Sequence, residues 1–406
     1  MTLFAGEELS FDIRETEGPA RSSNRDINEK YVRGEIRIVT EQARYPLNTI
    51  ADIVENRSYK LTPEYQRRHR WSRDQQSRLI ESLIMNVPIP PIFLYEYDYS
   101  KYEVMDGLQR LTAIHDFYRS NYELTGLSQW RELNGKRYVD LPDRVREGID
   151  RRYLSSVILL KETAKDEAEA LRLKQMVFER INSGGAALKP QETRNAIYDG
   201  PMNQLCIKLS KNGSLCRLWG IPVPEESEIG GGAPSQERLE NADFREMMDV
   251  ELVLRFLAYR QKKSLHKGNA SLSAYLDAYL QQGNRFTDAV LAQLNTLFET
   301  VISLVESALG ERAFWLFRSR GKEPNIRWAW LERPTTTVYD PLMYVISNRI
   351  HQEMEIRRAA ERIQNELEGF YQENYEIFGG RDVNRSILVA REVRLNALFD
   401  RIVGQP

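Results

Sequence analysis

The stretch Tyr102-Glu103-Val104-Met105-Asp106-Gly107-Leu108-Gln109-Arg110-Leu111-Thr112-Ala113 decides the fold of the N-terminal half of the chain. Its first residues favour a β-strand, and the apolar residues that follow the glycine at a spacing of three predict a helix (Leu111, Ile114, Phe117). A strand that turns through Gly107 into a helix presents backbone N–H groups and the positive end of the helix dipole, and Arg110 adds a fixed positive charge. The sequence therefore predicts an anion site. The alternative is a tight turn that needs Gly107 only for its φ angle.

A second segment, residues 65–78, precedes this turn and contains five arginines and two aromatic residues. Arginines together with aromatic residues are typical of phosphate contacts combined with base stacking. The alternative is a solvated loop in which Trp71 packs as an anchor.

A third segment, residues 180–195, reads as the end of one helix, a glycine loop and a second helix that Pro190 opens. Asn182 and Glu192 lie at these two helix ends, where they are placed to meet a ligand. As an alternative, Asn182 is a C-terminal cap and Glu192 is a first-turn acid that favours the helix dipole.

Length and composition describe an ordinary soluble protein. The chain has 406 residues, enough for two or three domains, with 41% hydrophobic and 29% charged residues. Its net charge is −2, so contact with nucleic acid requires a local basic patch. We expect a cytoplasmic protein, because the sequence has no secretory signal, no apolar run that would span a membrane and only two cysteines.

Four regions are expected along the chain, on the basis of periodicity and composition. Residues 1–30 read as a flexible arm, 31–200 as an α+β domain, 201–236 as a connecting segment and linker, and 237–406 as a mainly α-helical domain in which strand signals nearly vanish.

Local signals place several elements of the α+β domain. Ser72 with Gln75 predicts a capping box at the start of a helix. Residues 92–95 and 102–105 predict two strands joined by a turn at 98–101.

These motifs resemble a known family. Gly107-x-x-Arg110-x-x-Ala113 is similar to the phosphate motif of the ParB and sulfiredoxin superfamily. In the same order along the chain, Leu79–Leu83, Pro88–Leu94 and Asp106–Arg110 resemble the N-terminal domain of GmrSD-type restriction enzymes. Residues 182–192 keep the spacing of a ParB stretch that binds metal and phosphates. The resemblance implies a ParB/sulfiredoxin-like fold for the first domain.

The resemblance also implies nucleotide binding with slow hydrolysis of a nucleoside triphosphate. The implied catalytic residues are Asp106, Gln109 and Arg110, and Asp106 is the implied ligand of Mg²⁺. The implied nucleotide-binding residues are Gly107, Arg110, Gln66, Arg67, Trp71, Asn182 and Glu192. In this interpretation Arg110 and the N–H groups near Gly107 hold the phosphates, while Asp106 or Gln109 positions the attacking water.

For the biological setting, the resemblance implies a sensor or regulator in a prokaryotic restriction or antiphage system. None of the four histidines lies in a setting typical of an HNH nuclease, which needs histidine as general base and metal ligand. We therefore expect a standalone member that works with a separately encoded effector or nuclease. Nucleoside triphosphate and DNA are the other expected partners, no membrane contact is expected, and homo-oligomers stay open.

Two other functions also stay open. One is a DNA-binding adaptor without nucleotide turnover, in which Arg68, Arg70 and Arg73 contact DNA phosphates. Leu108 stands where the family has Gln, and Ile181 stands where ParB has Glu, which favours this alternative. The other is a nuclease whose active site the sequence does not reveal.

Overall fold

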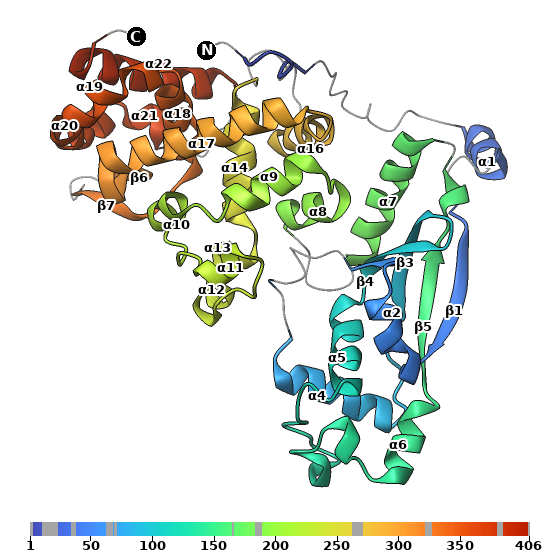
Figure 1. Cartoon of the computed structure of the whole chain (residues 1–406). Helices are drawn as coiled ribbons and strands as arrows, with labels where there is room; N and C mark the ends of the chain where they lie inside the picture. The colour runs from blue at the N-terminus through green and yellow to red at the C-terminus, as the bar shows by residue number, and fades with distance from the viewer. Residues whose placement is uncertain are drawn as a thin grey trace. The chain divides into compact units, whose positions relative to one another are not determined.

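The computed structural model describes residues 3–9, 23–33, 38–61, 68, 71–164, 166–182, 189–261, 271–320, 327–379 and 385–404. The chain divides into two compact units (Figure 1). The α/β unit comprises Glu17–Ile197, and the helical unit comprises Met1–Thr16 together with Tyr198–Pro406. The α/β unit is therefore inserted, in sequence, between two pieces of the helical unit.

A five-stranded mixed sheet forms the centre of the α/β unit. In spatial order its strands are β1 (Thr40–Pro46), β5 (Tyr153–Leu159), β3 (Ile92–Asp98), β4 (Lys101–Asp106) and β2 (Tyr59–Lys60). The pairs β1–β5 and β3–β4 are antiparallel, whereas β3–β5 and β2–β4 are parallel. The predicted α+β class is confirmed, as are the two strands predicted on either side of the turn at 98–101.

Helices cover the sheet and close its core. The helices that contribute to one hydrophobic core are α2 (Ile50–Glu55), α4 (Arg73–Ile84), α5 (Leu108–Tyr118) and α6 (Asp143–Asp150). From the sheet, Leu94 and Val104 point into this core. Glu103 points to the opposite face because side chains alternate along a strand, and there it pairs with Lys174 of α7 (Glu167–Asn182) at 2.8 Å.

The N-terminus of α4 is built as the sequence predicts. The Ser72 hydroxyl accepts from the backbone N–H of Gln75, and the Gln75 side chain accepts from the backbone N–H of Ser72. This reciprocal pair confirms the predicted capping box and fixes where the chain enters the helix.

The helical unit is organised around α17 (Asp288–Leu309), which packs against α9 (Pro201–Leu209), α18 (Thr336–Ser347) and α20 (Ala360–Glu373). Ten of the 22 residues of α17 are buried apolar residues. Among the described residues it is the one helix long and apolar enough to cross a membrane by length and composition. Its packing against these and other helices of the unit is that of a core helix.

The first residues of the chain belong to this helical unit. Glu7 is fully buried; its carboxylate accepts from the guanidinium of Arg260, and its carbonyl accepts from the side chain of Gln261 at 2.6 Å. Residues 3–9 therefore differ from the flexible arm expected for residues 1–30, because a buried charge pair attaches them. Residues 24–33 of the same region form helix α1 (Asn24–Arg33).

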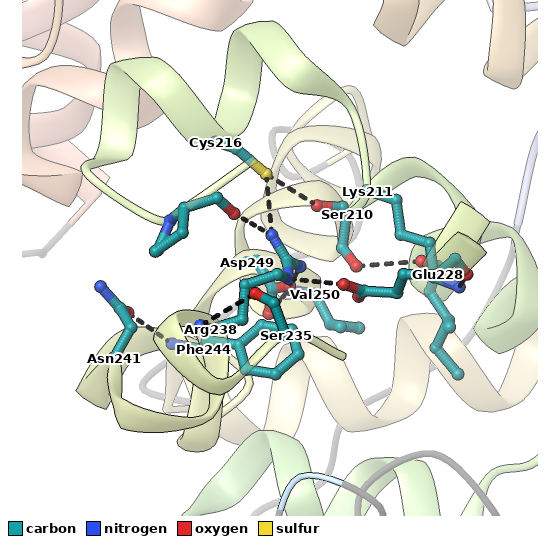
Figure 2. Close-up of polar contacts among 12 residues, drawn as sticks. Ser210, Lys211, Cys216, Glu228, Ser235, Arg238, Asn241, Phe244, Asp249 and Val250 are labelled. Carbon is teal, nitrogen blue, oxygen red and sulfur yellow. Dashed lines mark hydrogen bonds and ion pairs between the residues drawn. The ribbon is translucent and has the colours of Figure 1, made fainter. Parts of the chain in front are cut away.

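The region expected to be a connector, residues 201–236, also differs from that expectation. It forms α9, α10 (Gly213–Trp219) and α11 (Glu226–Ile229) within the helical unit. Two residues of this region contact the fully buried Arg238, whose Nε lies 3.1 Å from Glu228 and whose Nη1 donates to the carbonyl of Pro222 (Figure 2). These contacts attach the region to the helical unit, although Gly230, Gly231 and Gly232 themselves are exposed.

The helical unit contains one feature that the helical periodicity does not predict. Strands β6 (Trp315–Arg320) and β7 (Arg327–Pro334) form a two-stranded antiparallel sheet. After it, Thr335 caps the first turn of α18 by accepting from the N–H of Thr337.

Candidate anion site at the β4–α5 turn

The turn between β4 and α5 requires glycine at position 107 for two reasons. Gly107 has φ +96°, in the left-handed region that residues with a Cβ rarely adopt. A Cβ on Gly107 would also lie 2.5 Å from Cγ2 of Ile92 and 3.0 Å from Nη2 of Arg110. The glycine therefore brings the backbone close to both the strand and the guanidinium.

The Arg110 side chain is folded back onto this turn. Its Nη2 donates to the Asp106 carboxylate at 2.7 Å and to the carbonyl of Pro91 at 3.2 Å. Only 12% of the side chain is exposed, and its Nε is buried without a hydrogen-bond partner among the described residues. The guanidinium is thus positioned from two sides and retains unused donor capacity.

Helix α5 begins without a cap. Gly107 has no side chain to accept from the first N–H groups, and the first turn contains no acidic residue. The helix is 11 residues long, so its first N–H groups carry the positive end of a helix dipole. Together with Arg110, this end of the helix is suited to an anion such as phosphate.

Gln109 and Trp71 are linked across this site. The backbone N–H of Trp71 donates to the Oε1 of Gln109 at 3.1 Å, which ties the residue before the α4 cap to the first turn of α5. The Trp71 ring packs against the hydrophobic core of the unit. The structure therefore gathers five residues named from the sequence: Trp71, Asp106, Gly107, Gln109 and Arg110.

The other named residues divide into two groups. Gln66, Arg67, Arg70 and the side chain of Asn182 lie outside the described residues. Arg68 is only 4% exposed, which leaves little of it for a DNA contact. Arg73 donates to Gln76 at 2.8 Å and lies 4.9 Å from the centre of the Tyr122 ring, so its guanidinium has partners within the unit.

Glu192 occupies the first turn of α8 (Pro190–Ile197), the helix that Pro190 opens as predicted. Its side chain is buried, and its Oε2 accepts from the backbone N–H of Lys189 at 2.6 Å. This contact is the helix-start role that was the alternative to ligand binding.

For a metal ion, the described residues offer no cluster of three or more histidine, cysteine, aspartate or glutamate side chains. Asp106 supplies a carboxylate at the turn, and its side chain is 38% exposed. Mg²⁺ commonly takes one or two protein carboxylates and completes its shell with phosphate oxygens and water. Asp106 therefore fits Mg²⁺ only when a phosphate ligand accompanies the ion.

One part of the site was missed by reasoning from the sequence. The Pro91 carbonyl positions Arg110, and Ile92 is the residue that a side chain at position 107 would strike. Pro91 ends the run Val87-Pro88-Ile89-Pro90-Pro91, and Ile92 follows it. The run predicts an extended entry into β3, but it does not predict the contact of Pro91 with Arg110, 19 positions later.

Comparison with known proteins agrees with this geometry. Residues 50–198 match the family described as GmrSD restriction endonuclease, N-terminal domain, a range that includes the strands β2 to β5 and the whole β4–α5 turn. No curated protein and no solved structure matches the chain. Residues 50–198 thus belong to the GmrSD restriction endonuclease N-terminal domain family, and this membership implies a role in restriction or defence.

Proposed function

We propose that the α/β unit binds a nucleoside triphosphate at the start of α5 and hydrolyses it. In this role the chain acts as a sensor or regulator of a prokaryotic restriction or antiphage system, together with a separately encoded effector. One observation carries the proposal: α5 begins at a left-handed glycine, with no cap and no first-turn acid, and Arg110 lies beside that glycine. The resemblance of the Gly107–Ala113 motif to a phosphate motif supports the same assignment.

Each residue at the turn has a chemical role in this proposal. The N–H groups at the start of α5 and the Arg110 guanidinium donate to phosphate oxygens. Asp106 orients the attacking water and accepts its proton, and Gln109 helps to position that water. When bound, Mg²⁺ would be held by Asp106 and the phosphates and would neutralise charge on the phosphate oxygens.

Isothermal titration of the full chain with ATP, GTP, CTP and UTP in the presence of Mg²⁺ tests the binding. Saturable binding of at least one nucleotide is expected, and Arg110→Ala should abolish it. Arg119→Ala is the matched control, because Arg119 lies at the other end of α5 and pairs with Glu55 at 2.7 Å. Circular dichroism of both variants separates lost binding from lost fold.

Two results would contradict the proposal: no heat with any of the four nucleotides, or equal affinity in Arg110→Ala and the parent protein. Either result would move the function to the second candidate, a DNA-binding adaptor that keeps the fold without turnover. The substitution of Leu108 for the family's Gln is the observation that favours this candidate. A phosphate-release assay on any nucleotide that binds then decides whether turnover follows binding.

A further inference from the structure

Helices α4 and α5 pack against each other in the α/β unit (Figure 1), and one hydrogen bond joins their starts. The backbone N–H of Trp71, the residue before the cap of α4, donates to Oε1 of Gln109 in the first turn of α5 at 3.1 Å. A backbone N–H can only donate, whereas a glutamine amide accepts through its oxygen and donates through its nitrogen. The contact therefore fixes which end of the Gln109 amide faces α4.

Trp71, which supplies this N–H, is itself anchored. Its ring packs against the hydrophobic core of the unit, and the next residue, Ser72, forms the capping box with Gln75. The first turn of α4 is also attached to the loop after α5, where the Thr125 hydroxyl donates to the Asp74 carboxylate at 2.8 Å. Because a capping box sets the direction in which the chain enters a helix, the Trp71 N–H has a defined position relative to α5.

Such an anchor matters because a glutamine side chain is flexible. It has several rotatable bonds, and its amide can turn end for end unless a partner selects one orientation. An amide that positions water for phosphoryl transfer must present one end in a defined direction. The Trp71 N–H supplies this constraint without using Arg110 or the first N–H groups of α5, which hold the phosphates in the proposed function.

We propose that the start of α4 is a positioning element of the triphosphate site: the Trp71 N–H, held in place by the capping box of Ser72, orients the Gln109 amide for turnover. This inference rests on the proposed function. It gives Trp71 a role that uses its backbone, while its ring packs in the core. Positioning of this kind acts in the transition state, so its loss lowers kcat and leaves the affinity for the triphosphate near that of the parent protein.

Hydrogen exchange of the Trp71 amide in the full chain without nucleotide, followed by NMR, tests the contact itself. Gln109→Ala removes the acceptor and should speed the exchange of the Trp71 N–H. Gln109→Glu retains an oxygen acceptor, so exchange should be no faster than in the parent protein. If Gln109→Ala leaves the exchange rate unchanged, the hydrogen bond does not hold this N–H and the inference is wrong.

The kinetics of phosphate release test the role in turnover. Ser72→Ala removes the cap that holds Trp71 and should lower kcat about tenfold, since small misplacements are costly in such sites. The Kd of the triphosphate, from calorimetry, should stay within about twofold of the parent value. Ser72→Thr keeps a hydroxyl that can cap the helix and should restore most of kcat.

The matched control is Ser271→Ala in the helical unit. Ser271 caps α16 (Leu272–Gly283) by accepting from the backbone N–H of Ala274 at 3.1 Å, and α16 has 12 residues, as α4 does. The control loses a helix cap of the same kind and should keep the parent kcat and Kd. Circular dichroism of both alanine variants separates lost turnover from lost fold.

Four results would overturn the inference: parent kcat in Ser72→Ala, an equal loss of kcat in Ser271→Ala, no recovery in Ser72→Thr, or a loss of affinity in Ser72→Ala as large as its loss of kcat. The last result would mean that the capping box supports the whole pocket. A parent protein that binds no triphosphate or releases no phosphate would overturn the proposed function and this inference together. An active parent with an equally active Ser72→Ala would overturn this inference alone.

Discussion

The guanidinium of Arg110 donates to the carboxylate of Asp106 at 2.7 Å, one helical turn apart across the β4–α5 junction. A triphosphate that binds at the start of α5 must share the guanidinium with this carboxylate or displace it. The ion pair therefore holds the Arg110 guanidinium in place before a triphosphate binds. The same contact lowers the affinity for the triphosphate, because the Asp106 carboxylate competes with it for the guanidinium.

Replacing Asp106 with Asn separates these two effects. Asp106→Asn removes the competing negative charge, so triphosphate affinity should stay level or rise severalfold, while phosphate release should fall by about 100-fold if the carboxylate accepts the proton of water. Calorimetry gives the first quantity and a coupled phosphate assay gives the second. Unchanged phosphate release in Asp106→Asn would remove Asp106 from the chemistry.

Gly107→Ala should destabilise the α/β unit through two separate costs. The left-handed φ costs an alanine about 1–2 kcal/mol, and the contact of its Cβ with Ile92 adds further strain. Gly135→Ala is the matched control, since Gly135 has φ +80° and no atom within 4 Å of a Cβ placed there. Urea unfolding of both variants should show a larger loss for Gly107→Ala. Equal losses would mean that the neighbouring Ile92 gives way without cost.

Glu81 should make the α/β unit sensitive to acid. Burial alone would raise the pKa of Glu81, but the backbone N–H groups of Trp130, Gln129 and Ser128 together lower it, with the first two at 2.9 and 2.7 Å. Because the folded pKa is lowered, the stabilisation is present above the ordinary carboxyl pKa of 4.5 and is lost as the pH falls through the folded value.

Thermal melts of Glu81→Gln test this dependence. At neutral pH the variant should lose about 1–3 kcal/mol, because an amide nitrogen would then face a backbone donor. Between pH 6 and pH 3 it should lose less stability than the parent. Glu147→Gln, at an exposed pair with Arg144, should melt like the parent at every pH. A variant curve parallel to that of the parent would assign the acid sensitivity to other groups.

Glu7→Gln should destabilise the helical unit, because it leaves the buried guanidinium of Arg260 without its counter-charge. Breaking a buried ion pair from one side costs about 3–5 kcal/mol. Glu366→Gln, which removes a partly exposed partner of Arg362 and Arg401, should cost below about 1 kcal/mol. Unfolding in guanidinium chloride, followed by tryptophan fluorescence, compares the stability of the two variants. Similar midpoints would show that residues 3–9 contribute no more than a surface pair does.

Features of the α/β unit that depend on neighbours in sequence were predictable. The capping box needs only Ser72 and Gln75, and the β4–α5 turn needs only a strand, a glycine and helical spacing. These interactions span a few residues, so local preference and tertiary packing agree. By contrast, the contact of Arg110 with Pro91 is set by strand pairing, which local sequence does not specify.

The helical unit shows where local reasoning fails. Strands β6 and β7 have several apolar and aromatic residues in succession, and without strict alternation such short runs are ambiguous between strand and helix. The buried pair of Arg238 with Glu228 attaches the region around the exposed glycines 230–232 to the helical unit, and this contact is not visible in the local sequence. Glu7 and Arg260 are 253 residues apart, a separation that no local pattern reports.

The attachment of residues 3–9 also has a consequence for how this protein can be divided or recombined. Since residues 1–16 belong to the helical unit and the chain returns to that unit at Tyr198, the α/β unit is a cassette with two junctions. Truncation before residue 17 would remove part of another unit's interior while leaving the cassette intact. A chimaera that exchanges the cassette therefore needs two splice points. After a single protease cut between the junctions, the two flanking pieces would still be held together by the buried ion pair of Glu7 with Arg260.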